Sequence, residues 1–179
     1  MITAAVSRMF LATNRKTLRR FHVDSPLTEE AREVICRLSN LRELSVVIER
    51  GTSLSSVVLP NLTDLTIQYD HDCDWLQGLR GATFEKLASV TIRSSSESVG
   101  NFLEVFASVT FKTSVPATLS MFYTSRRLRP NYRSLLLFSQ LKELVISFSW
   151  EDSFPSGIDD DAIADIALAM PGLEILQLG

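Results

Sequence analysis

The feature that most constrains the fold is a short apolar spacing, Leu-x-x-Leu-x-Ile, which recurs at irregular intervals through the chain. The fourth and sixth residues of each copy are two positions apart, so in an extended segment both side chains point to one face. A strand this short cannot bury that face alone, and only stacked neighbours close a core around it. The spacing therefore predicts about seven short strands that pack side by side. The copies are Leu18-x-x-Phe21-x-Val23, Leu41-x-x-Leu44-x-Val46, Leu62-x-x-Leu65-x-Ile67, Leu87-x-x-Val90-x-Ile92, Leu141-x-x-Leu144-x-Ile146, Leu173-x-x-Leu176-x-Leu178 and a weaker Leu119-x-x-Phe122-x-Thr124.

Helical patterns fill most of the intervals between these copies. Thr28 and Ser94 are typical residues for the start of a helix, and Asn131 can open a short one. Asp159 is expected to begin a further helix, which Pro171-Gly172 ends and whose inward residues are Ile163, Ile166, Ala167 and Met170. An alternation of strand and helix is typical of leucine-rich repeats. The predicted fold is thus an α/β leucine-rich-repeat solenoid, with short parallel strands on the concave side and helices on the convex side.

Three segments carry a more specific resemblance. They are "IDDDAIADIALAMPGLEILQLG" at residues 158–179, "LPNLTDLTI" at 59–67 and "LSNLRELSV" at 38–46. They resemble the repeats of F-box-type leucine-rich-repeat proteins, particularly fungal ones, and the likeness extends over roughly residues 18–179. The resemblance implies a curved solenoid that captures protein targets, often as the receptor of a ubiquitin ligase. It concerns the repeat region only, since the sequence shows no F-box segment.

The first residues differ from the rest of the chain. Ile2, Val6, Met9 and Phe10 fall on one helical face, and every charged residue before Asp24 is basic. We expect residues 1–17 to form an amphipathic helix that packs on the first repeat of a domain spanning residues 18–179. A mitochondrial presequence is the alternative interpretation.

Composition limits the classes of partner. Apolar residues make up 45% of the 179 residues and charged residues 22%, and the net charge is -3. No global positive charge favours nucleic acid, and no apolar run is long enough to cross a bilayer. The two cysteines make no disulfide framework, which favours a reducing compartment. The predicted location is cytoplasmic or nuclear, with the mitochondrion as the alternative.

The cluster Asp70-His71-Asp72-Cys73-Asp74 raises the question of a metal or catalytic site. Ligands of zinc usually come from separated positions whose side chains converge, whereas adjacent residues diverge. We therefore interpret this segment as a loop whose acids cap a short helix, and we expect no metal and no cofactor. The sequence also lacks the common nucleophile, phosphate-loop and zinc-protease motifs. The chain is predicted not to be an enzyme, and catalysis by the 70–74 loop is the less favoured alternative.

The outward positions of the strands are the better candidates for binding. The third, fifth and seventh residues of each copy are expected to form rows across the concave face. Among them, the predicted partner-binding residues are Met121, Tyr123, Val145, Arg93, Gln68 and Glu143, in which the apolar members serve as an anchor for a protein partner. The arginine-rich segment 125–133 could bind phosphate or an acidic peptide, although a solvated loop is the favoured interpretation.

These observations predict a module for non-catalytic recognition of a protein partner, with the target-binding repeats of an F-box-type adaptor as its more specific form. The alternative is a stand-alone structural or assembly scaffold. Residues 173–179 complete a strand signature at the end of the sequence without a helix to follow. We expect the chain to be part of a longer repeat protein, or to self-associate through that C-terminal strand.

Overall fold

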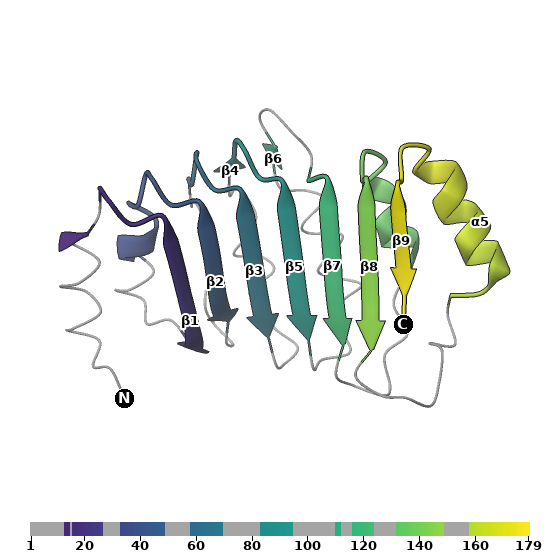
Figure 1. Ribbon diagram of the computed structural model, residues 1–179, viewed down its shortest axis with the longest axis horizontal. Helices are drawn as coiled ribbons and strands as arrows, with labels where there is room; N and C mark the ends of the chain where they lie inside the picture. The colour runs from purple at the N-terminus through teal and green to yellow at the C-terminus, as the bar shows by residue number, and fades with distance from the viewer. Residues whose placement is uncertain are drawn as a thin grey trace.

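The computed structural model describes residues 13–14, 16–26, 33–48, 58–69, 83–94, 110–111, 116–123, 132–148 and 158–179. The main element is a seven-stranded parallel sheet in which the strands follow one another in chain order (Figure 1). Its strands are β1 (Arg20–Pro26), β2 (Glu43–Ile48), β3 (Asp64–Tyr69), β5 (Ser89–Ser94), β7 (Thr118–Tyr123), β8 (Glu143–Phe148) and β9 (Ile175–Leu178). The predicted α/β class and the seven parallel strands are therefore confirmed.

The same backbone arrangement joins each strand to the next. At the start of each strand, one carbonyl accepts hydrogen bonds from two successive N–H groups of the following unit; Arg19, for example, accepts from Arg42 at 2.7 Å and from Glu43 at 3.0 Å. The equivalent carbonyls belong to Arg42, Thr63, Ala88, Ala117 and Lys142. Because this link involves only main-chain atoms, it repeats whatever side chains the units carry.

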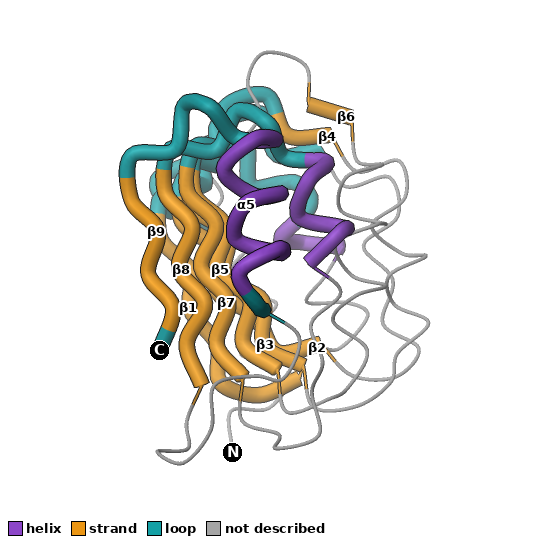
Figure 2. Tube along the Cα trace, turned by 90° about the vertical axis from the view of Figure 1, so that its right-hand side faces the viewer, coloured by secondary structure: helices purple, strands orange, loops and turns teal. Residues whose placement is uncertain are grey.

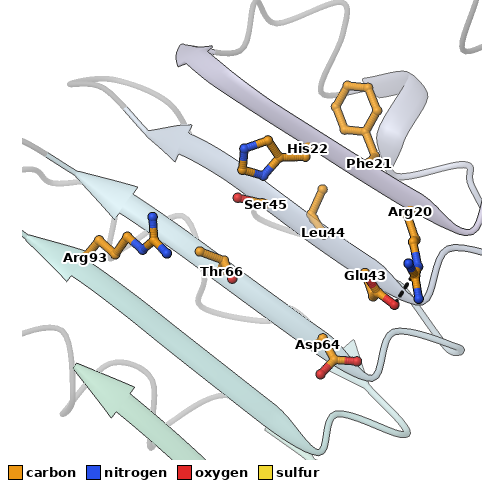
Figure 3. Close-up of a pocket in the computed structure, with 9 residues that line it drawn as sticks. All are labelled: Arg20, Phe21, His22, Glu43, Leu44, Ser45, Asp64, Thr66 and Arg93. Atoms are coloured by element: carbon orange, nitrogen blue, oxygen red, sulfur yellow. Dashed lines mark ion pairs between the residues drawn. The ribbon is translucent and has the colours of Figure 1, made fainter. Parts of the chain in front are cut away.

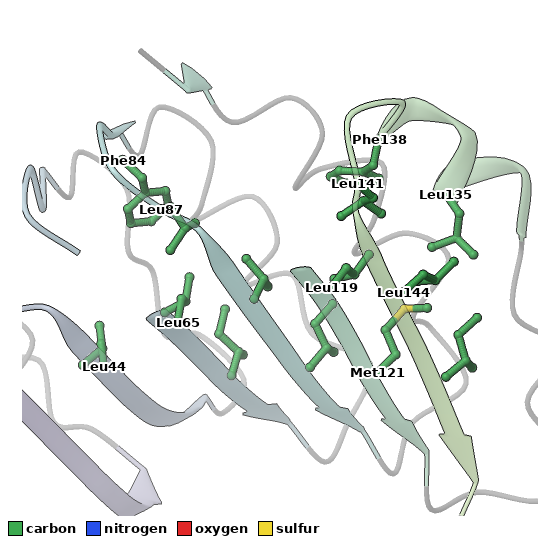
Figure 4. Close-up of a cluster of buried hydrophobic side chains, with 14 of the residues drawn as sticks. Leu44, Leu65, Phe84, Leu87, Leu119, Met121, Leu135, Phe138, Leu141 and Leu144 are labelled. Carbon is green, nitrogen blue, oxygen red and sulfur yellow. The ribbon is translucent and has the colours of Figure 1, made fainter. Parts of the chain in front are cut away.

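The core consists of the positions that the apolar spacing marks. Leu41, Leu62, Leu87 and Leu141, which lead their units, are each 0% exposed. The fourth and sixth residues of the central units are equally buried and form one continuous cluster with them (Figure 4). Full burial of one such side chain contributes about 1.5–3 kcal/mol. The series of leucines is thus the principal source of stability, as the spacing predicts.

A second set of contacts connects the turns that precede the strands. The Asn40 side-chain amide donates to the carbonyl of Lys16 at 2.7 Å, and the Asn61 amide donates to the carbonyl of Ser39 at 2.8 Å. Asn40 and Asn61 occupy the same position of adjacent units, directly before the leading leucine. The Lys86 ammonium, at that position in the next unit, donates to the Asn61 side-chain oxygen at 2.8 Å. Each of these three turns is thereby tied to the preceding one.

Two helices lie on the same side of the sheet (Figure 2). The helix α5 (Asp160–Ala169) begins at the predicted place, because the Asp159 carboxylate accepts a hydrogen bond from the Ala162 N–H at 2.9 Å. Ile166 and Met170 are buried as predicted, but Ala167 is exposed and Ala162 is buried in its place. The other helix is the 3₁₀ helix η1 (Tyr132–Leu137), and α5 packs against it.

Two further short strands, β4 (Thr83–Phe84) and β6 (Thr110–Phe111), pair parallel in a separate sheet. No helix within the described ranges combines the length and the apolar character needed to cross a membrane. Of the N-terminal helix predicted at residues 1–17, residues 1–12 and 15 lie outside the described residues, and so does the predicted start of a helix at Thr28.

Candidate functional site

One face of the sheet is buried and the other is accessible to solvent. Alternate residues along each strand point to opposite faces, and those opposite the core are half-buried or exposed, except Val47, which aligns with Gln68 but is buried. We call this surface the open face; its residues are Arg20, His22, Glu43, Ser45, Asp64, Thr66, Gln68, Ser89, Thr91, Arg93, Thr118, Ser120, Phe122, Glu143, Val145, Ser147, Ile175 and Gln177. Parallel sheets usually have both faces covered, so an accessible face of this extent is a candidate for binding.

Strand register arranges the open face in rows that run across the sheet. The middle row contains four hydroxyl side chains on successive strands, Ser45, Thr66, Thr91 and Ser120, and continues with Val145. A row nearer the strand starts contains the carboxylates Glu43, Asp64 and Glu143. The open face therefore offers hydrogen-bond donors and acceptors over its centre and negative charge along one margin.

The row nearer the strand ends contains an aromatic side chain next to a cation. Gln68, Arg93, Phe122 and Ser147 are aligned on adjacent strands. The Arg93 guanidinium lies over the Phe122 ring, with its central carbon 5.8 Å from the ring centroid. Such a contact is favourable by about 0.5–1 kcal/mol at an exposed site. Phe122 is nonetheless 37% exposed, so part of its ring is available for a partner.

A hollow of about 520 Å³ lies on the open face over β1, β2, β3 and β5. Its charged and polar lining residues are Arg20, His22, Glu43, Ser45, Asp64, Thr66 and Arg93 (Figure 3). Arg20 and Glu43, at aligned positions of β1 and β2, form an ion pair of 2.8 Å. Arg93 lines this hollow and also contacts Phe122, so it connects the hollow with the aromatic position.

His22 faces the open side, as predicted for the fifth position of its unit. Its Nε2 atom lies 2.7 Å from a carboxylate oxygen of Asp24 on the same strand, and both side chains are mostly exposed. Among the residues that the structure describes, no group of three or more His, Cys, Asp or Glu side chains is placed to hold a metal ion.

Four of the six predicted binding residues lie on the open face. Arg93 is exposed, whereas Gln68, Glu143 and Val145 are half-buried. Arg93 and Gln68 are neighbours in register on β5 and β3, and Glu143 and Val145 belong to β8. Their contact with a partner remains a prediction.

The prediction that Met121 and Tyr123 lie on this face is wrong. Met121 is 0% exposed and Tyr123 is 1% exposed, and both belong to the hydrophobic core. The Tyr123 hydroxyl donates to the Met121 sulfur at 3.4 Å, and the Tyr123 ring stacks on Phe148 with centroids 5.3 Å apart. Figure 4 shows Met121 among the buried leucines.

The error comes from the register of β7. Leu119 aligns with Val90 and Leu144, which are fourth residues of their units, so Pro116 rather than Leu119 stands in the leading position. The correct spacing is Pro116-x-x-Leu119-x-Met121, and it places Phe122 outward. A proline in place of the leading leucine hid this copy, although the alternation of Leu119, Met121 and Tyr123 was a usable signal.

Two sites considered from the sequence cannot be placed. The cluster at residues 70–74 lies outside the described residues, and so do residues 125–131 of the arginine-rich segment. The structure instead adds the hollow beside β1, whose lining residues Arg20, His22 and Asp64 were expected to point outward but were not among the predicted binding residues.

Comparison with known proteins assigns no family to this arrangement. No protein-family model matches the chain, and a search of curated proteins gives no significant match.

Proposed function

We propose that the chain is a leucine-rich-repeat solenoid whose function is non-catalytic recognition of a protein partner through the open face. The observation that carries the proposal is the exposed Phe122 beneath the Arg93 guanidinium, in a face formed by strands in continuous register. Binding energy at protein interfaces concentrates on a few aromatic and arginine side chains that become desolvated in the complex.

The repeat class is supported by the recurring main-chain link and by the shared buried positions. Units whose contacts are chiefly with their neighbours in sequence, each contributing one strand to a parallel sheet, are typical of solenoids. In this class the helices cover the convex side, and α5 and η1 share one side of the sheet in agreement with it (Figure 2). The resemblance of residues 18–179 to F-box-type repeat proteins leads us to propose target selection for a ubiquitin ligase as the more specific function.

The chemistry of the face suggests what a partner presents. Phe122 offers part of an aromatic ring for an apolar side chain, and Arg93 offers guanidinium donors that suit a carboxylate beside it. The row from Ser45 to Ser120 supplies hydroxyls for polar groups that flank this contact. The partner is expected to carry an apolar anchor next to an acidic side chain.

Site-specific photocrosslinking tests the proposal. A benzophenone amino acid replaces Phe122 in one variant and Leu168 in the other; Leu168 is 81% exposed on α5 and serves as the matched control. We expect position 122 to crosslink one or a few cellular proteins that position 168 does not, and the Arg93→Glu change to reduce that crosslink about tenfold.

The identity of the crosslinked protein separates the specific forms of the proposal. Ligase subunits purified together with a crosslinked target support the adaptor, whereas components of an organelle complex support the scaffold. Equal crosslinking at positions 122 and 168, or a crosslink insensitive to Arg93→Glu, would show that the open face is not the contact surface.

We also propose self-association through β9. It is the last strand of the seven-stranded sheet, and Ile175 and Leu176 are 51% and 38% exposed. Strand edges with exposed apolar side chains favour pairing with another chain.

A further inference from the structure

A second hollow, of about 450 Å³, lies where the first strands begin, and it shares no described lining residue with the hollow on the open face. The described residues that line it are Lys16, Thr17, Arg19, Asn40, Arg42 and Asn61. Three of these side chains are cationic and exposed, and the other three are neutral and polar. None of these lining residues is acidic, although the chain as a whole has a net charge of -3. The hollow is therefore a local concentration of positive charge.

The arginines of this hollow differ from the charged residues of the neighbouring rows. Arg19 and Arg42 precede β1 and β2 at the same position of adjacent units, which lie about 4.8 Å apart in a sheet. At that position in two later units, Lys142 and Glu174 form an ion pair of 3.2 Å. One residue further on, Arg20 pairs with Glu43 at 2.8 Å. The sheet thus pairs opposite charges in these rows, whereas Arg19 and Arg42 bring two like charges together, which is unfavourable unless an anion joins them.

The asparagine contacts hold the hollow in place. The Asn40 and Asn61 amides each donate to a carbonyl of the preceding unit, and Lys86 donates to the Asn61 oxygen. No carboxylate of the described ranges forms an ion pair with Lys16, Arg19 or Arg42. The three cations therefore extend from connected turns with their donors available for a ligand.

We propose that this hollow binds a phosphate monoester dianion. Guanidinium groups match the oxygens of a phosphate with paired donors, and a lysine adds a compact charge. Three cations in a hollow of this size suit one compact dianion, whereas an extended nucleic acid would meet the negative net charge of the rest of the molecule. The site is separate from the open face, so the inference does not rest on the proposed function.

Titration of the full chain with phenyl phosphate at constant ionic strength tests this site, with chemical shifts of the Arg19 and Arg42 amides as the readout. We expect saturable shifts with phenyl phosphate and at least tenfold weaker binding of benzenesulfonate, which has the same ring but a single charge. Arg19→Gln and Arg42→Gln should each weaken binding about tenfold, because a charge-assisted hydrogen bond is lost. Arg42→Lys should retain part of the affinity. Lys142→Gln is the matched control, because Lys142 occupies the equivalent position in a later unit, and it should leave binding unchanged.

Further ligands distinguish the sources of the phosphate. Tighter binding of an acetyl-Ala-phosphoserine-Ala-amide peptide than of inorganic phosphate would assign the site to a phosphorylated protein segment, provided that the unphosphorylated peptide does not bind. Equal or weaker binding of that peptide would assign it to a free phosphorylated compound. The proposal is overturned if phenyl phosphate causes no saturable shift, if Lys142→Gln weakens binding as much as Arg42→Gln, or if a ten-residue oligothymidine binds more tightly than phenyl phosphate does.

Discussion

At the level of single residues, Met121 and Phe122 show how one step along a strand changes what a side chain does. Met121 is fully buried against the core, and Phe122 is exposed beside Arg93. Met121→Ala should lower the free energy of unfolding by about 2–5 kcal/mol, since it leaves a cavity in a packed core. Phe122→Ala should lower it by less than Met121→Ala does, because the Phe122 side chain is 37% exposed and the change opens no enclosed cavity. Urea unfolding followed by circular dichroism measures both, and a larger loss for Phe122→Ala would contradict the assigned faces.

Replacing a core leucine by a charged residue tests whether the leucine positions of the units form the core. Leu65 is 2% exposed and Leu144 is 0% exposed, so an aspartate at either position would bury an unpaired carboxylate. The cost is several kcal/mol, comparable with the total stability of a domain, about 5–15 kcal/mol. We expect both variants to lack a cooperative thermal transition, whereas Leu168→Asp on exposed α5 should melt like the parent. Parent-like melting of Leu65→Asp would show that the leucine series is not the core.

At the level of elements, the edge strand β9 differs from the strands inside the sheet. Leu176 aligns with Leu144, yet it is 38% exposed where Leu144 is fully buried, because β9 has a partner strand on one side only. We expect concentration-dependent self-association that Leu176→Lys reduces, since a charge on the edge opposes pairing. Analytical ultracentrifugation over a hundredfold concentration range measures it. Leu168→Lys, which adds the same charge elsewhere on the surface, is the control.

A monomer at every concentration would contradict self-association through β9. An equal reduction by both lysine variants would show that net charge, and not this edge, sets the association.

The strands also show what the sequence reveals and what it does not. The spacing of Leu62, Leu65 and Ile67 predicts a strand and its buried face, because apolar alternation is a local property. The recurrence of that spacing predicts the neighbouring strands. The spacing fails for β7, because Pro116 stands in the leading position and the first leucine, Leu119, lies three residues later in the unit. An odd shift exchanges the two faces of a strand, so Met121 and Tyr123 were placed outward.

The two hollows could not be predicted in the same way. The open-face hollow depends on side chains that four strands bring together, among them His22 of β1 and Arg93 of β5, and the basic hollow depends on side chains such as Lys16 and Asn61 from three separate units. These positions become neighbours only through strand register. The sequence contained the asparagines in "LSNL" and "LPNL", but their contacts with the preceding turn required the positions of the backbone carbonyls.

At the level of the whole molecule, the main contacts of each strand in the large sheet are with the strands next to it in the chain. The stability of such an array is approximately a sum over units and their shared interfaces, and β1 and β9, at the two ends of the described sheet, each have one neighbouring strand. Native-state hydrogen exchange should therefore show the greatest protection for amides of β5 and the least for β1 and β9. β1 is further weakened by the register shift between His22 and Pro26. Uniform protection across all strands would indicate a single cooperative unit instead.

At the start of each strand one carbonyl accepts hydrogen bonds from two N–H groups of the next unit, and this link fixes how neighbouring strands align. The link sets the register at the entry to a strand and does not depend on the residues between one strand and the next. The segment from Ile48 to Asp64 is much shorter than the segment from Phe148 to Ile175, yet β2 with β3 and β8 with β9 pair residue for residue. Insertions and deletions in these segments therefore leave the open face in alignment. The connecting segments can vary in length while the open face keeps its geometry, provided that buried residues such as Leu62 and Leu141 are kept. If the open face binds a partner as we propose, single substitutions on it would change its specificity without altering the fold.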